Sequence, residues 1–136
     1  MSNTAKYQHL SLEVRKERFK YVLLRGEANL DEFDQLGQYC LFVSPKETSC
    51  VLPCSVKVSN VTKEESGWEC WQIRGEMPFG SVQGLIAEIS GRLIRDKIGV
   101  CVISTFLTDF FFIKEQYSEN ARKTLAQIGW KIQVEE

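Results

Sequence analysis

The sequence has little of what the common classes of enzyme use for catalysis. It contains one histidine, His9, in a polar N-terminal stretch, and it has no G-x-S-x-G motif, phosphate loop or paired-carboxylate pattern. Its five cysteines are odd in number and form no C-x-x-C pair. Reduced core cysteines are therefore expected rather than a disulfide framework or a zinc site. We predict no metal, no cofactor and no catalytic activity.

Long apolar runs and an excess of charge of one sign are also missing. No stretch approaches the roughly 20 apolar residues of a membrane span. The N-terminal residues lack the apolar segment of a signal peptide. The net charge of −1 over 136 residues argues against nucleic-acid binding, which needs a basic stripe. The expectation is a cytoplasmic protein of one domain or two very small ones, with no membrane or nucleic-acid partner.

The clearest feature that is present is a pair of apolar stretches joined by a short bend. Cys101–Ser104 and Asp109–Ile113 have the composition of β-strands, and residues 105–108 (TFLT) predict the bend. Tight hairpins usually carry Asn-Gly or Asp-Gly, because those residues accept a positive φ. This bend has no glycine and places Phe106 between threonines. That composition favours contact with a polar group beside an aromatic wall.

Residue patterns predict the remaining elements. Strands are expected at residues 19–24, 39–44, 48–52, 68–74 and 130–134, with a short helix at 28–36, a loose tail or surface helix at 1–17, and a solvated, turn-rich segment at 59–67. Apolar residues at helical spacing from Val82 to Leu93 predict a helix capped by Ser81. Ser118 is expected to cap a second helix, which ends at Gly129.

The second half therefore has the order strand, helix, strand, strand, helix, strand. This βαββαβ order is that of a ferredoxin-like unit, an antiparallel four-stranded sheet with both helices on one face. The first half has the pattern of a shorter copy. We predict an α+β protein with an N-terminal tail (1–17), a degenerate first unit (18–72) and a second unit (73–136). Edge-to-edge pairing of two sheets would cover exposed strands.

Several segments carry a likeness to a known family: Gly67-Trp68, 75–84 (GEMPFGSVQG), 98–100, 104–110 (STFLTDF) and, in the first half, 42–53 (FVSPKETSCVLP). With these segments the chain resembles the ACT-domain family, specifically its small tandem-ACT proteins, which are similar to the ACT modules of the CASTOR arginine sensors. The resemblance implies regulatory binding of an amino acid at an interface between ACT modules, in a homo-oligomer such as a dimer.

One position departs from the family pattern. The family has glycine at the end of its first helix, where this chain has Lys97, with Gly99 two residues later. If the left-handed turn is kept, Lys97 must adopt it at some cost in free energy.

A free amino acid carries an ammonium and a carboxylate, so its site needs acceptors and donors. The start of the helix at Ser81 would offer N–H groups to the carboxylate. Asp109 and Thr105 would accept from the ammonium or from a cationic side chain, and Phe106 would supply an apolar or cation–π wall. The glycines near the helix start would let a ligand approach the backbone. The full candidate set is Gly80, Ser81, Val82, Gly84, Thr105, Phe106, Asp109 and Glu76.

These residues also have structural interpretations, which the sequence leaves open. Asp109 would then accept only from backbone N–H groups of the bend, Ser81 would only cap its helix, and Glu76 would face water. Two other classes of protein remain: an interaction module with an empty ACT site, and a small acylphosphatase-like hydrolase using Arg25 in a loop after the first strand. The rings of 110–112 (FFF) are expected to be core rather than an RNA-stacking platform, since strand alternation sends them to both faces.

Overall fold

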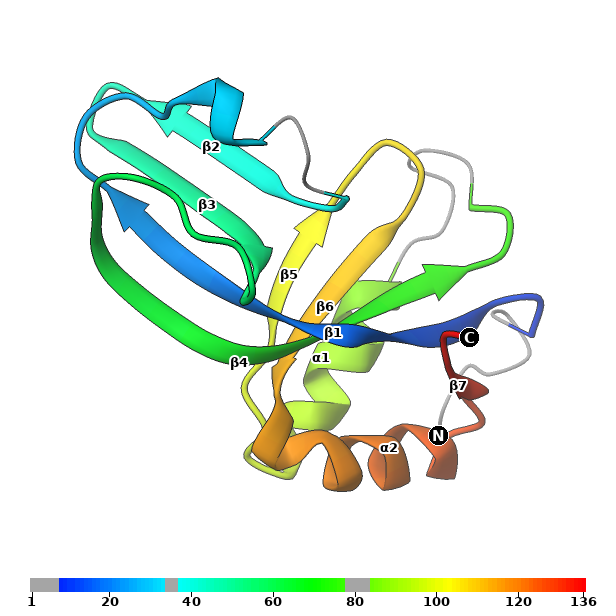
Figure 1. Ribbon diagram of the computed structural model, residues 1–136. Coiled ribbons are helices and arrows are strands. Elements are labelled where there is room, and N and C mark those ends of the chain that lie inside the picture. The colour runs from blue at the N-terminus through cyan, green and yellow to red at the C-terminus, as the bar shows by residue number, and fades with distance from the viewer. Residues whose placement is uncertain (1–7, 34–36, 78–83) are drawn as a thin grey trace. The chain divides into compact units, whose positions relative to one another are not determined.

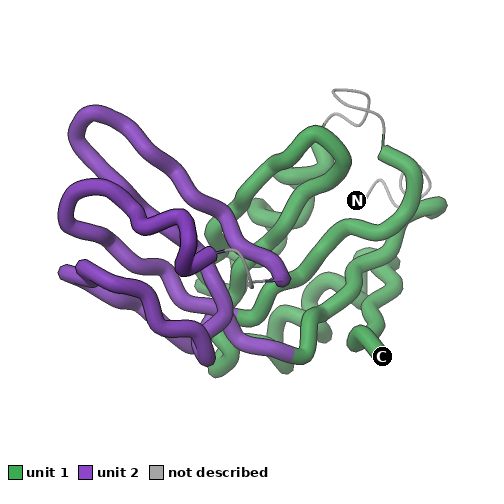
Figure 2. Tube along the Cα trace, turned by 45° about the horizontal axis from the view of Figure 1, so that its top comes forward, with its two compact units in different colours: residues 1–16, 69–136 green, residues 17–68 purple. Residues whose placement is uncertain are grey.

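A computed structural model describes residues 8–33, 37–77 and 84–136 (Figure 1). The elements in chain order are β1 (Ser11–Leu24), the 3-10 helix η2 (Leu30–Phe33), β2 (Cys40–Ser44), β3 (Glu47–Pro53), β4 (Val61–Arg74), α1 (Leu85–Arg95), β5 (Cys101–Ser104), β6 (Asp109–Lys114), the 3-10 helix η3 (Glu115–Tyr117), α2 (Ser118–Gln127) and β7 (Ile132–Val134). The chain forms two compact units: unit 1 contains residues 1–16 and 69–136, and unit 2 contains residues 17–68 (Figure 2).

Unit 1 contains the ferredoxin-like order β4, α1, β5, β6, α2, β7, as predicted from the second half. Its sheet has one strand more than expected, because the first half of β1 lies between β7 and β4, and β6 and β5 follow. β5 and β6 are antiparallel, with Ser104 opposite Asp109, whereas β7 is parallel to β1, with Ile132 opposite Leu12. The predicted α+β class is confirmed, and the predicted four-stranded sheet of this unit is wrong.

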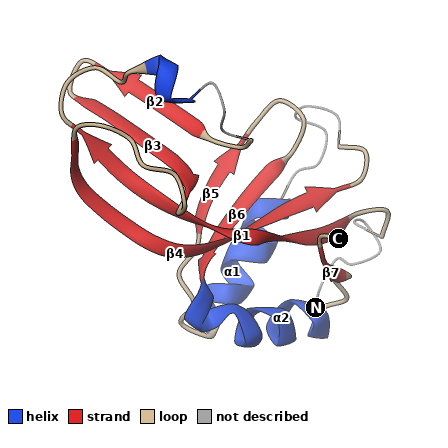
Figure 3. Ribbon diagram, in the orientation of Figure 1, coloured by secondary structure: helices blue, strands red, loops and turns tan. Residues whose placement is uncertain are grey.

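Both helices of unit 1 pack on one face of its strands, as Figure 3 shows. Leu85, Ile89 and Leu93 repeat at helical spacing and form the buried stripe of α1. α2 buries Ala121 and Leu125 in the same core. The strands contribute alternate residues to it, together with Leu10 just before β1: Leu12, Val14, Trp71, Ile73, Phe111 and Ile113. This arrangement follows directly from the two sequence periodicities, 3.6 residues for helices and two for strands.

The two helices end with the same backbone motif. At the end of α1, the N–H of Lys97 donates to Ile94 O at 2.9 Å and the N–H of Ile98 donates to Leu93 O at 3.0 Å. This is the Schellman motif, in which the residue after the cap has a left-handed conformation. Lys97 has φ 60°, so the family's turn is kept with a lysine in place of glycine.

At the end of α2 the corresponding residue is Gly129, with φ 97°. Its N–H donates to Ala126 O at 3.0 Å, and the N–H of Trp130 donates to Leu125 O at 3.1 Å. The predicted position of Gly129 at the end of this helix is confirmed. The prediction for the other end is wrong, because Tyr117 occupies the N-cap position and Ser118 is the first helical residue.

Two long strands differ most from the expectation. Residues 11–17 begin β1 rather than a tail or surface helix. The predicted turn at 59–67 is confined to residues 59–60, and residues 61–67 belong to β4, although residues 61–66 are exposed as predicted. Both segments are rich in charged or polar residues, which hid the strand pattern. Their partners are distant in sequence: the N–H of Arg25 donates to Asn60 O at 2.8 Å, and Thr62 Oγ1 donates to Leu23 O at 3.1 Å.

Unit 2 has the strand order β2, β3, β1, β4, using the second half of β1 and the first half of β4. β3 is antiparallel to both of its neighbours. The core of this unit is small and consists of Val22, Leu24, Phe33, Cys50 and Leu52. The helix expected at 28–36 is only the 3-10 helix η2 at Leu30–Phe33, and residues 34–36 lie outside the described part of the chain.

Candidate functional site

The bend between β5 and β6 is closed by its own threonines. The N–H of Thr105 donates to Thr108 O at 2.8 Å, and Thr105 Oγ1 donates to the same oxygen at 3.1 Å. The N–H of Thr108 in turn donates to Thr105 Oγ1 at 3.3 Å. Side-chain hydroxyls thus replace the glycine conformations that a tight hairpin usually needs. The residues that the sequence predicted as a bend therefore form one, with no positive φ.

A further hydrogen bond fixes this bend to the neighbouring strand. Thr108 Oγ1 is buried and donates to Ile73 O at 2.8 Å, near the C-terminal end of β4. β4 ends at Arg74 and α1 begins at Leu85 (Figure 1), and residues 78–83 between them lie outside the described part of the chain. The bend is the corner that the sequence predicted as the acceptor side of a site.

Asp109 is the buried charge at this corner. It is 8% exposed, and it begins β6 on the face where Phe111 and Ile113 enter the helix-covered core. Within the described part of the chain, its carboxylate forms no hydrogen bond and no ion pair. The bend is closed by Thr105 and Thr108 instead, so the structural interpretation of Asp109 as the acceptor for bend N–H groups does not hold among these residues.

The tip of the bend carries two large apolar side chains. Phe106 is 73% exposed and Leu107 is 76% exposed, the highest values among the large apolar side chains of the described residues. Most such side chains of unit 1 are in its core. An exposed apolar pair beside a buried carboxylate is therefore a distinct local feature, and Phe106 was among the predicted site residues.

The donor side is described only in part. α1 begins at Leu85 with Gly84 at the N-cap position, where φ is 81°, so the predicted start of this helix with Ser81 as its cap is wrong. The first described bond of the helix runs from the N–H of Glu88 to Gly84 O at 2.9 Å, so the N–H groups of residues 85–87 precede the regular helical bonds. The predicted site residues Gly80, Ser81 and Val82 lie outside the described residues.

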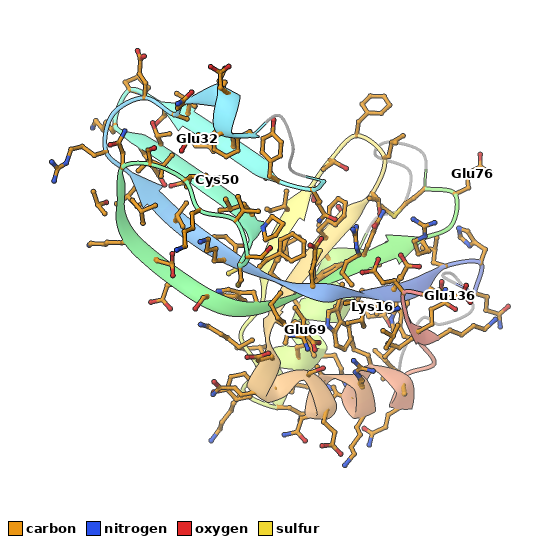
Figure 4. All side chains as sticks on the ribbon, viewed as in Figure 1. Lys16, Glu32, Cys50, Glu69, Glu76 and Glu136 are labelled. Atoms are coloured by element: carbon orange, nitrogen blue, oxygen red, sulfur yellow. The ribbon has the colours of Figure 1, made fainter. Side chains whose placement is uncertain are left out.

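Two other residues singled out from the sequence are exposed. Glu76 lies just beyond β4 and points away from unit 1 (Figure 4). Arg25, the anion-binding residue of the hydrolase alternative, is exposed at the end of β1 in unit 2. Its backbone N–H closes the connection to Asn60 O, and the following Gly26 has φ 71°.

One buried carboxylate was missed in the sequence. Glu69 of β4 is 3% exposed and accepts from Trp71 Nε1 at 2.9 Å and from Ser118 Oγ at 2.6 Å (Figure 4). Arg122 Nε donates to Ser118 Oγ at 3.3 Å, and its guanidinium lies 5.9 Å from the Trp71 ring centroid. The sequence signal that could have identified Glu69 is an acidic residue between two tryptophans, Trp68 and Trp71, of a predicted strand. Because Glu69 is occupied by these donors and holds the start of α2, its role is structural.

The remaining chemistry of the described residues gives no second site. All five cysteines are free, and burial raises the pKa of Cys50 to about 12, with a smaller effect from Cys40. A thiol with that pKa stays protonated at neutral pH and is a poor nucleophile. No group of three or more potential metal ligands occurs in the described part of the chain. No helix among these residues is long and apolar enough to cross a membrane.

Phe111 enters the core of unit 1, whereas Phe112 is buried outside that cluster. The prediction that the three phenylalanines divide between the two faces is therefore confirmed for this pair. A stacking platform on one face is not formed by adjacent rings of a strand.

In a comparison with known protein families, residues 63–127 match the family model of the ACT domain. No curated protein matches the chain. A solved protein of Agobacterium tumefaciens is similar with a TM-score of 0.82 and 22% identity, over 94% of this chain and 95% of that chain. A Vibrio cholerae protein, described as a possible transport protein, is similar with a TM-score of 0.65 and 17% identity, over 90% of this chain and 91% of that chain.

The regulatory subunit of aspartate kinase from Thermus thermophilus, in its ligand-free form, is similar with a TM-score of 0.59 and 11% identity, over 87% of this chain and 96% of that chain. At these identities the likeness to solved structures concerns the fold. The predicted resemblance is confirmed as a match of residues 63–127 to the ACT-domain model and as a likeness of fold to the regulatory subunit of aspartate kinase. The finer likeness to CASTOR modules stays a prediction.

Proposed function

We propose that the Asp109 corner of unit 1 binds the ammonium group of a free amino acid, and that the protein is a regulatory module without a catalytic step of its own. The observation that carries the proposal is Asp109, a residue that is 8% exposed and whose carboxylate forms no hydrogen bond or ion pair with the other described residues. The match of residues 63–127 to the ACT domain supports an amino acid as the ligand.

The physical reason is the attraction between a carboxylate and an ammonium group. A hydrogen bond between two charged groups is shorter and stronger than one between neutral groups, and it is strengthened where part of the surrounding water is excluded. Structural carboxylates normally have hydrogen-bond donors within the protein, as Glu69 has in Trp71 and Ser118. Asp109 lacks them in the described part of the chain, so a cationic group supplied from outside would complete its environment.

The carboxylate of the same ligand would be bound by the start of α1. Backbone N–H groups at the beginning of a helix have no acceptor within the helix and carry a partial positive charge. Gly84 at the N-cap position has no side chain to block a ligand. Gly80, Ser81 and Val82, which precede it, complete this side of the proposed site as predicted from the sequence.

The wider proposal follows the family resemblance. The protein would be cytoplasmic and would self-associate as a homo-oligomer such as a dimer, with the ligand at an interface between the ACT modules of different chains. Light scattering coupled to size-exclusion chromatography tests the oligomeric state, and a mass equal to that of one chain across micromolar concentrations would contradict self-association.

A thermal-shift panel of the common amino acids tests the ligand proposal. At a concentration 100 times its Kd, a ligand adds about 2.7 kcal/mol to the free energy of unfolding, which corresponds to a rise in Tm of about 8 °C for a chain of this size. We expect this rise with at least one amino acid and not with its N-acetyl derivative, which has no ammonium group. If no amino acid raises the Tm, the proposal is wrong.

Two variants locate the site. Asp109→Asn keeps the shape of the side chain and removes its charge, so we expect an unchanged or higher Tm without ligand and a loss of most of the ligand-induced rise. Glu76→Gln removes an exposed carboxylate of the same unit, and its effect reports whether Glu76 belongs to the site as the sequence predicted. An undiminished rise in Asp109→Asn would exclude Asp109 from ammonium binding.

A further inference from the structure

We infer that the amino acid bound at the Asp109 corner has an uncharged, apolar side chain, which packs on Phe106 and Leu107. This inference rests on the proposed function and adds the chemical class of the ligand. It comes from three features of one hairpin: an exposed apolar tip, a bend whose polar groups are already used, and a single unpaired charge.

The tip offers apolar surface to a ligand. Phe106 and Leu107 are 73% and 76% exposed, so most of each side chain lies at the surface. Covering apolar surface is favourable in proportion to the area removed from water. The two residues are presented by a bend with internal hydrogen bonds, which limits the ordering that binding would require.

The polar groups of the bend offer little to a polar ligand side chain. Thr105 Oγ1 donates to Thr108 O and accepts from the N–H of Thr108, while Thr108 Oγ1 donates to Ile73 O. Each hydroxyl therefore already has a protein partner. A ligand hydroxyl or amide packed on this tip would lose its water without gaining equivalent hydrogen bonds, which disfavours polar side chains.

The charges at this end of unit 1 favour a ligand with no net charge. Asp109 supplies one negative charge for the ammonium group, and the start of α1 supplies partial positive charge for the carboxylate. The cation at the end of β4, Arg74, is paired with Glu13 at 4.0 Å. Glu76 points away from the unit. A charged ligand side chain would therefore lack a counter-charge among the described residues of the hairpin.

Isothermal titration calorimetry of the full chain with leucine, phenylalanine, lysine and glutamate tests the inference. We expect leucine or phenylalanine to bind at least ten times more tightly than lysine or glutamate. Phe106→Ala and Leu107→Ala should each weaken leucine binding about tenfold, because each removes apolar contact area. Both residues are exposed, so the fold should tolerate the changes, and an unchanged Tm without ligand verifies this.

Two controls separate the contact from general effects. Free glycine has no side chain, so any affinity for it should change less than threefold in Phe106→Ala. Val43→Ala shortens an apolar residue of β2 in unit 2 that is 65% exposed, and it should leave leucine binding unchanged.

The outcomes distinguish this inference from the proposed function. If lysine or glutamate binds most tightly and Asp109→Asn abolishes that binding, the proposed function stands and the apolar ligand class is wrong. If leucine binds but neither tip variant weakens it, the tip contacts something else, such as a protein partner, and the inference is also wrong. If no amino acid binds, both proposals fail.

Discussion

Replacing Gly75 by alanine should destabilise the protein more than the same change at Gly26, Gly37, Gly91 or Gly99. An added Cβ atom would meet nothing within 4 Å at those four glycines, but it would clash at Gly75. Gly75 follows β4 and has φ +118°, a conformation that other residues rarely adopt. A Cβ atom there would lie 2.7 Å from His9 O and 2.8 Å from Leu10 Cδ2. Both distances are below those of real contacts, so the backbone near His9 or the packing of Leu10 must change.

The expected magnitude follows from these terms. Strained backbone of this kind costs of order 1–3 kcal/mol. Forcing a methyl group into a filled space costs a further 1–3 kcal/mol or so. The reduced freedom of the unfolded chain offsets about 0.4–1 kcal/mol. The free energy of unfolding should therefore fall by about 1–5 kcal/mol, which is large beside the roughly 5–15 kcal/mol of a typical domain.

Urea unfolding followed by circular dichroism measures this loss, with an unchanged m-value showing that the compactness of the states is retained. Gly91→Ala is the matched control, because Gly91 lies within α1 and a Cβ there would meet nothing within 4 Å. Alanine is favoured over glycine inside a helix by about 0.5–1 kcal/mol, so this variant should be slightly more stable. A Gly75→Ala protein within about 0.5 kcal/mol of the wild type would refute the steric reasoning.

Four further variants test other parts of the structure. Lys97→Gly should raise the free energy of unfolding by about 0.5–1.5 kcal/mol, because glycine adopts φ 60° without strain. Gly129→Ala should lower the free energy of unfolding, because alanine at φ 97° is strained. Urea titrations that give the opposite signs would contradict the left-handed conformation of these two residues. Glu69→Ala removes the acceptor of two side-chain donors and should cost about 2–4 kcal/mol in the same assay, whereas a near-neutral result would show that the network contributes little. Since burial raises the pKa of Cys50 from 9.0 to about 12, the unfolded thiol ionises first, and stability is lost as the pH rises above 9 toward 12. Cys50→Ala should remove this part of the alkaline loss in urea titrations at about pH 8 and 10.5, and an identical loss in both proteins would contradict it.

The hairpin and the helices could be predicted because their signals are local. Apolar residues at strand or helix spacing formed β5, β6, α1 and α2 near the expected places. The family's turn at Lys97 could also be anticipated, because the glycine it replaces has a known conformational reason. Such features depend on neighbours within a few positions, and a sequence records those neighbours directly.

The long strands could not be predicted for the opposite reason. The charged start of β1 and the polar start of β4 become strands through backbone bonds to distant partners, such as the N–H of Arg25 to Asn60 O. Backbone hydrogen bonding is the same for all residues except proline, so composition does not reveal where it occurs. The insertion of β1 between β7 and β4 is likewise a property of the whole fold.

The sequence by itself determined which residues could contact a ligand in the hairpin: a carboxylate, a threonine and an aromatic ring within five positions. Only the tertiary structure decided how these groups are used. The threonines bind each other and Ile73, Phe106 is exposed, and Asp109 is buried without a partner among the described residues. Burial and hydrogen-bond partners depend on how β4, β6 and α1 pack together, and that packing separates a structural aspartate from a candidate for binding.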